Sequence, residues 1–170
     1  MSDMRSDPAA RTTRRYPTAV DTAGVLVRPP LLYLCSILIG SALELVRPLP
    51  FAPPSLEASL GGLLVVAALV LFTFSVREFQ GAGTPLPTNR PTRTIVRSGP
   101  YRFSRNPIYL AFSLLHLGIA IWTNGAWLLA TLAVTLLVMS YGVIAREERY
   151  LAGRFGEEYL AYKASVRRWL

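Results

Sequence analysis

The sequence predicts an all-α integral membrane protein with about four transmembrane helices and a C-terminal amphipathic segment of cytoplasmic helix. Two observations support this fold class. Residues 106–145 contain no Asp, Glu, Lys or Arg, and a second charge-free stretch covers residues 58–76. Hydrophobic residues make up 52% of the chain and charged residues only 16%, whereas an ordinary soluble domain has roughly 25% charged residues. The composition therefore argues against a soluble globular protein and against a disordered chain.

The expected elements are an arm, one membrane domain and its four spans. Residues 1–25 are polar and lack the apolar core of a signal peptide, so we expect a flexible cytoplasmic arm followed by a single membrane domain at 26–170. Within that domain the expected transmembrane helices and the cytoplasmic tail are, in order, 30–47, 57–77, 107–123, 126–145 and 146–170.

Two of these spans need a particular justification. The charge-free stretch 106–145 would measure roughly 60 Å as one helix, about twice the hydrocarbon thickness of a bilayer. The turn signal Thr-Asn-Gly at 123–125 divides it, which predicts a helical hairpin. The span at 30–47 is short and contains Glu44, so it crosses the membrane either tilted or through a locally thinned bilayer.

The arginines predict the orientation. All of the 18 basic residues except Arg47 fall on the side of the bundle that holds both chain termini. The positive-inside rule places that side, with both termini, in the cytoplasm of an inner or plasma membrane. Anionic lipid headgroups account for the pI of about 10.2, and no motif that reads a nucleic-acid groove is present, so we expect no nucleic-acid partner.

The chain has one cysteine, Cys35, and one histidine, His116. A disulfide framework and a Cys/His zinc cluster are therefore excluded, and no metal site is expected. His116 shares a helical face with Arg105 and Tyr109. We expect it to pack in the bundle through a hydrogen bond, although an ionisable residue within a membrane is also a functional candidate.

The cytoplasmic pieces carry the remaining polar residues. Asn106 is a suitable N-cap and Pro107 a suitable first residue for the third helix, whose free N–H groups would attract an anion. Glu147 and Glu148 follow the fourth helix, where negative charge needs partners because a helix C-terminus is itself negative. Arg102 and Arg105 lie on the same side. An Arg/Glu cluster at this junction is a candidate ligand site.

The tail at 146–170 has an amphipathic stripe that is typical of one or two short helices, broken near Gly156 and lying at the membrane surface. The stripe consists of Leu151, Phe155, Tyr159, Tyr162, Val166 and Trp169. It fits either a surface anchor or a lid over a site.

The run GPYRFSRNPIYL at 99–110, the hydrophobic hairpin and the run REERYLAGRFGEEYLAYKASVRRWL at 146–170 resemble one family. This is the isoprenylcysteine carboxyl methyltransferase and phospholipid methyltransferase family of integral membrane enzymes. The resemblance covers residues 80–170. It implies an S-adenosylmethionine-dependent methyltransferase that binds this cofactor between the last two helices and the tail, without a Rossmann domain.

The resemblance also implies roles for individual residues. The catalytic candidates are Arg105, Glu147 and Glu148. The cofactor-binding candidates are Gly99, Tyr101, Arg102, Asn106, Pro107, Tyr109, Leu110, Glu148 and Tyr159. Two positions depart from the family pattern, since Asn106 replaces the usual histidine and Ala111 a common glycine. Any step that needs an imidazole at residue 106 therefore cannot occur here.

The expected reaction is methyl transfer to a lipophilic acceptor, resembling an isoprenylcysteine carboxylate or an aminolipid, that enters from the bilayer at the cytoplasmic face. A small thiol or a quinone-like lipid also remains open as acceptor, and so does the oligomeric state. Two other functions compete with this one. One is a membrane reductase that uses a reduced nicotinamide cofactor. The other is a non-enzymatic small membrane protein, such as a transporter subunit, although no internal repeat supports it.

Overall fold

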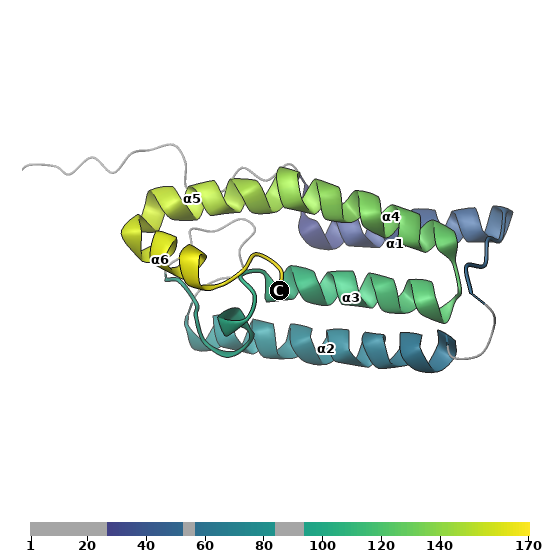
Figure 1. Cartoon of the computed structure of the whole chain (residues 1–170), viewed down its shortest axis with the longest axis horizontal. Coiled ribbons are helices and arrows are strands. Elements are labelled where there is room, and N and C mark those ends of the chain that lie inside the picture. Colours follow the sequence, from purple (N-terminus) through teal and green to yellow (C-terminus); the bar gives the residue numbers. More distant parts are fainter. Residues whose placement is uncertain (1–26, 53–56, 84–93) are drawn as a thin grey trace, which may run out of the picture.

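The computed structural model describes residues 27–52, 57–83 and 94–170 (Figure 1). The expected arm at 1–25 lies outside these ranges. The described residues form helices and connecting segments, with no strand among them. The all-α membrane fold predicted from the sequence is therefore confirmed.

Four helices run side by side in alternating directions (Figure 1). They are α1 (Pro29–Val46), α2 (Glu57–Gly81), α3 (Pro107–Trp122) and α4 (Ala126–Val138). Three helices are long and apolar enough to cross a membrane, namely Pro29–Val46, Glu57–Gly81 and the continuous helix Ala126–Phe155. Helix α3 has 16 residues, which is about 24 Å of helix, so it is shorter than each of these three spans among the described residues. The span expected at 30–47, which the sequence indicates to be short, corresponds to α1 and is longer than α3.

The fourth helix does not end at residue 145 as expected. Helix α4 passes through a π-helical segment, η2 (Met139–Ile144), directly into α5 (Ala145–Phe155). Helix α5 continues the direction of α4 (Figure 1). The first part of the tail is therefore an extension of α4 and not a separate short helix. The predicted break is at Gly156, which has a φ of 53° and precedes α6 (Glu157–Ser165).

Small residues bring the helices close together in two pairs. Gly61 of α2 faces the backbone of α3, where a Cβ atom at residue 61 would lie 2.5 Å from the Trp122 nitrogen. In the other pair, Ser36 of α1 donates a hydrogen bond to the Thr131 carbonyl of α4 at 3.1 Å. Close backbone approach at small residues is the usual way in which membrane helices pack.

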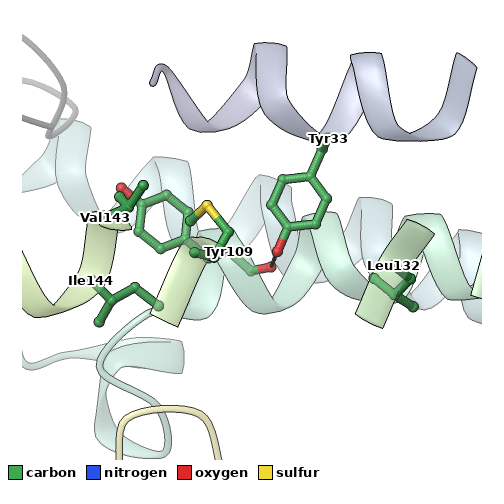
Figure 2. Close-up of a cluster of buried hydrophobic side chains, with 6 residues drawn as sticks. Tyr33, Tyr109, Leu132, Val143 and Ile144 are labelled. Atoms are coloured by element: carbon green, nitrogen blue, oxygen red, sulfur yellow. Dashed lines mark hydrogen bonds between the residues drawn. The ribbon is translucent and has the colours of Figure 1, made fainter. Parts of the chain in front are cut away.

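The core draws its side chains from α1, α3, α4 and η2 (Figure 2). Its buried cluster consists of Tyr33, Tyr109, Leu132, Met139, Val143 and Ile144. The Tyr33 hydroxyl lies 2.7 Å from Ser113 Oγ, which fixes α1 against α3. Deeper in the bundle, His116 is fully buried, with its Nε2 atom 3.5 Å from Thr131 Oγ1. The inward orientation predicted for His116 is therefore confirmed.

Candidate functional site

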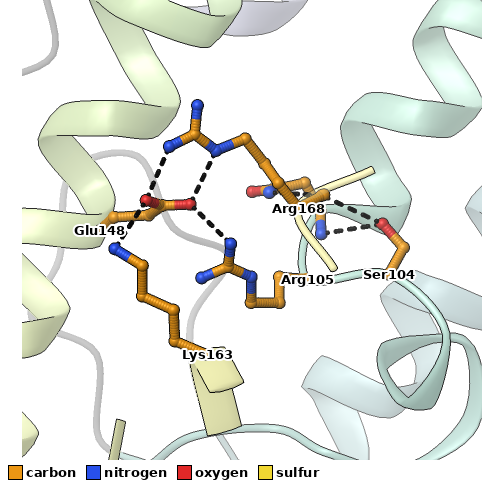
Figure 3. A network of polar contacts seen from close by, with 6 residues as sticks. Ser104, Arg105, Glu148, Lys163 and Arg168 are labelled. Carbon is orange, nitrogen blue, oxygen red and sulfur yellow. Dashed lines mark hydrogen bonds and ion pairs between the residues drawn. The ribbon is translucent and has the colours of Figure 1, made fainter. Parts of the chain in front are cut away.

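Polar side chains from four segments meet at one end of the bundle (Figures 1 and 3). These segments are the start of α3, the first turn of α5, helix α6 and residues 166–170. The opposite end of the bundle holds the 123–125 turn. The Arg/Glu cluster that the sequence predicted is thus present, and it is built around Glu148.

Glu148 is the centre of a network of three cations (Figure 3). Arg168 approaches it as a fork, with Nε 2.9 Å from Oε1 and Nη2 2.8 Å from Oε2. Arg105 Nη2 lies 3.2 Å from Oε1, and Lys163 Nζ lies 3.3 Å from Oε2. The hydrogen bond with Glu148 raises the pKa of the Arg168 guanidinium above its usual value. Both carboxylate oxygens are therefore occupied by cationic partners.

Arg105 is the most buried of these cations. Its side chain is only 9% exposed, and its Nε and Nη1 atoms have no hydrogen-bond partner among the described residues. A buried guanidinium with unsatisfied N–H groups is well suited to an incoming anion, since an anionic oxygen accepts a strong charge-assisted hydrogen bond from it. Arg102 is exposed and has no ion pair to either glutamate. Of the two arginines that the sequence offered, Arg105 therefore faces the site.

Glu147 points to a different partner from its neighbour. Successive residues of a helix are about 100° apart around its axis, so Glu147 faces α3 while Glu148 faces α6 and residues 166–170. The Tyr109 hydroxyl donates a hydrogen bond of 2.7 Å to Glu147 Oε1, and both side chains are buried. The other oxygen, Oε2, accepts no hydrogen bond from the described residues. Glu147 is thus the acid of the pair with an uncommitted oxygen.

Asn106 does not cap α3. Its side chain makes no capping hydrogen bond, although Pro107 does begin the helix as predicted. Instead, Asn106 Nδ2 donates to the Arg168 carbonyl at 2.9 Å, and the Asn106 backbone N–H donates to Ser104 Oγ at 3.1 Å. The expected capping hydrogen bond is absent, and the bond from Nδ2 instead directs the amide toward residues 166–170.

The turn that precedes α3, η1 (Gly99–Arg102), supports the site from the side of α2. Gly99 has a φ of 55°, and a Cβ atom there would lie 2.7 Å from the Glu78 carboxylate, to which Ser98 Oγ also donates a hydrogen bond. Tyr101 is buried against Phe79, with the ring centroids 5.1 Å apart. Burial raises the pKa of Tyr101 above its usual value. Both predicted residues therefore hold the turn in place and do not reach Glu148.

Helix α6 contacts the turn η1. Its Tyr162 hydroxyl donates to the Tyr101 carbonyl at 2.7 Å, and burial raises the pKa of Tyr162 to about 12. Tyr159 is 2% exposed, and burial raises its pKa too, while the charge of Arg105 opposes that shift. Leu110 contributes a backbone N–H bonded to the Asn106 carbonyl and makes no polar contact with the cluster.

Sequence reasoning missed two residues of the Glu148 network, Lys163 and Arg168, and it did not place Glu78 against the turn before α3. Lys163 belongs to the tail run at 146–170 that resembles the family, but nothing in that run indicates its contact with Glu148. Arg168 stands in a Val-Arg-Arg-Trp run in which Arg167 is chemically identical. Only the fold decides which of the two arginines reaches Glu148.

The chain is similar to one protein family and to several known proteins. The family model described as phospholipid methyltransferase matches residues 56–158. An uncharacterized protein of Haemophilus influenzae is 40% identical over 63 residues, which is 37% of this chain and all of that protein. No solved structure matches.

Two larger relatives match over shorter shares of their length. The cobalt-zinc-cadmium resistance protein CzcN of Cupriavidus metallidurans is 37% identical over 70 residues, 41% of this chain and 32% of that protein. Methanethiol S-methyltransferase 1 of Bradyrhizobium diazoefficiens is 44% identical over 66 residues, 39% of this chain and 22% of that protein. The chain thus covers a third or less of these two relatives.

Proposed function

Since the chain belongs to the phospholipid methyltransferase family, we propose that it transfers a methyl group from S-adenosylmethionine to a lipophilic acceptor at the cytoplasmic face of the membrane. The observation that carries this proposal is the buried cluster at one end of the bundle. There, two guanidinium nitrogens of Arg105, Nε and Nη1, have no hydrogen-bond partner among the described residues, and one oxygen of Glu147 accepts no hydrogen bond from them.

The side chains of this cluster suit the polar groups of the donor. S-adenosylmethionine has a carboxylate, an ammonium group and two ribose hydroxyls. The free Nε–H and Nη1–H groups of Arg105 can donate charge-assisted hydrogen bonds to the carboxylate, and the glutamates match the hydroxyls and the ammonium group. The start of α3 adds backbone N–H groups next to Arg105. The residues present therefore fit this cofactor.

Methyl transfer requires the protein mainly to position the donor and the acceptor. When bound, the sulfonium donor supplies a methyl group that is already activated by positive charge. The protein then has to orient the reactants and exclude water, which the buried side chains of Arg105, Tyr109 and Glu147 are placed to do. A carboxylate or thiolate acceptor needs no base. An amine acceptor loses a proton, which the uncommitted oxygen of Glu147 could accept.

The class of acceptor follows from the location of the site. A cluster at the end of an apolar bundle can receive a polar donor from the cytoplasm and an apolar acceptor sideways from the bilayer. An isoprenylcysteine carboxylate and an aminolipid both have this character. A small thiol is a further candidate, because the name of the Bradyrhizobium relative states that it methylates methanethiol.

The test is calorimetric titration of S-adenosylmethionine into the protein in nanodiscs. Saturable binding is expected. Glu147→Gln removes a negative charge and Arg105→Lys removes the guanidinium donors, so each variant should bind S-adenosylmethionine about tenfold or more weakly. Glu158→Gln is the matched control, since Glu158 is 58% exposed and pairs with Arg97 outside the cluster. Its affinity should equal that of the parent protein.

Transfer of a labelled methyl group to candidate lipids and thiols then identifies the acceptor. A folded parent protein that does not bind S-adenosylmethionine would refute the proposal. Binding of a reduced nicotinamide cofactor in its place would support the reductase alternative. Binding of neither cofactor would support a non-enzymatic role in the membrane.

A further inference from the structure

Residues 166–170 lie across the beginning of α3 as an extended segment, here called the strap. Val166 ends α6 with φ −126° and ψ 134°. The Arg167 carbonyl accepts a hydrogen bond from the Arg105 N–H at 3.0 Å, and the Arg168 carbonyl accepts one from Asn106 Nδ2 at 2.9 Å. The backbone of the strap is thus tied to the two residues that immediately precede α3.

The strap also covers Glu148. Arg168 binds both oxygens of this carboxylate with its guanidinium fork, and Trp169 packs against the buried cluster around Tyr109. Together with Arg105 and Lys163, this fork gives each carboxylate oxygen two cationic partners. A hydroxyl or ammonium group of a ligand reaches Glu148 only after Arg168 has moved away.

The contacts that hold the strap are few and partly solvated. The strap belongs to no helix, and the Arg168 side chain is 34% exposed, whereas that of Arg105 is 9% exposed. Partly exposed ion pairs contribute little to stability, and segments with few buried contacts open at low free-energy cost. The strap is therefore the part of the site that opens most easily.

We propose that the strap is a latch over the site, that it must lift before the methyl donor binds, and that Arg168 is the positioning residue that holds it closed. This inference rests on the proposed function for the identity of the ligand. The closed position itself does not depend on it. Asn106 takes part as a second tie, which gives the residue that replaces the family histidine a role in this chain.

The closed position is tested without any ligand. Trp169 becomes the only tryptophan in a Trp122→Phe/Trp127→Phe background, and acrylamide quenching reports its exposure. Arg168→Gln should raise the quenching constant about twofold, because it removes the fork to Glu148. Arg167→Gln is the matched control, since Arg167 is exposed and only its backbone carbonyl makes a contact. Equal quenching in the two variants would overturn the latch.

The gating role is tested in the same proteins by the rate of S-adenosylmethionine association, followed by Trp169 emission in stopped flow. Arg168→Gln should bind about five- to tenfold faster than the parent, because the open fraction sets the apparent rate. Arg168→Lys, which keeps the charge and loses the fork, should lie between them. A variant with exposed Trp169 and an unchanged rate would refute the gate while leaving the proposed function intact. A parent protein with protected Trp169 and no binding would refute the methyl donor as ligand and the proposed function with it.

Discussion

Glu148→Gln is expected to destabilise the protein far more than the same change at Glu158. Both glutamates form ion pairs with arginine at similar distances, 3.2 Å to Arg105 and 3.1 Å to Arg97. They differ in burial, because the side chains of the Glu148–Arg105 pair are 7% and 9% exposed while those of the Glu158–Arg97 pair are 58% and 44% exposed. Burial, and not distance, should therefore decide the cost.

The magnitude follows from that difference. Removing one partner of a buried ion pair costs about 3–5 kcal/mol, because the other charge is left unpaired in a poorly solvated place. Arg168 and Lys163 are more exposed, and each pair adds about 0–1 kcal/mol. We expect a loss of about 3 kcal/mol for Glu148→Gln, since the glutamine oxygen still accepts a hydrogen bond, and about 0–1 kcal/mol for Glu158→Gln.

The assay is thermal unfolding in one detergent, followed by tryptophan emission. For a chain of this length, 3 kcal/mol corresponds to a decrease in Tm of about 6–12 °C. A second change, Arg105→Gln in the Glu148→Gln background, should recover part of the lost stability, because it removes the stranded charge. Equal Tm values for the two single variants, or no increase in Tm in the double variant, would show that water solvates Arg105 once Glu148 loses its charge.

Three further changes test the packing around the site. Gly61→Ala should lower Tm by several degrees, because its Cβ atom would strike the α3 backbone. Gly62→Ala is the control: its Cβ atom would have nothing within 4 Å, so Tm should stay unchanged or rise. Equal effects on Tm would contradict the packing of α2 against α3. Tyr109→Phe should cost about 1–3 kcal/mol of unfolding free energy, since Glu147 loses its only hydrogen-bond donor among the described residues; an unchanged Tm would mean that water replaces the hydroxyl. Gly99→Ala should cost about 1–2 kcal/mol because of its positive φ, and an unchanged Tm would argue against the strained turn.

Local sequence signals predicted the boundaries of the helices well. Pro107 begins α3, the turn at 123–125 contains Asn124 with a φ of 51°, and Gly156 ends α5 with a φ of 53°. Such positions depend on the backbone of one or two residues, so proline, glycine and asparagine mark them directly. The charge-free stretches predicted the membrane class for an equally local reason, since each spanning helix must satisfy its own backbone in lipid.

The continuity of α4, η2 and α5 was not predictable in this way. Charged residues begin at Arg146, and a change from apolar to charged composition usually accompanies a change of element. Here the helix continues because its polar first turn finds partners, with Glu147 bound to Tyr109 and Glu148 bound to arginines. Composition indicates where a lipid-facing surface ends, but tertiary contacts decide where the helix ends.

The sequence by itself determined that this is a helical membrane protein, that Arg102, Arg105, Glu147 and Glu148 lie at one end, and which stretch resembles a methyltransferase motif. Only the tertiary structure decided that Arg105 and not Arg102 faces Glu148, that Arg168 and not Arg167 forms the fork, and that Asn106 binds the strap instead of capping α3. The physical reason is the distance between partners along the chain. Hydropathy and turn signals act within a few residues, whereas these contacts join residues 20 to 62 positions apart, and chemically identical candidates differ only in where the packed helices point them.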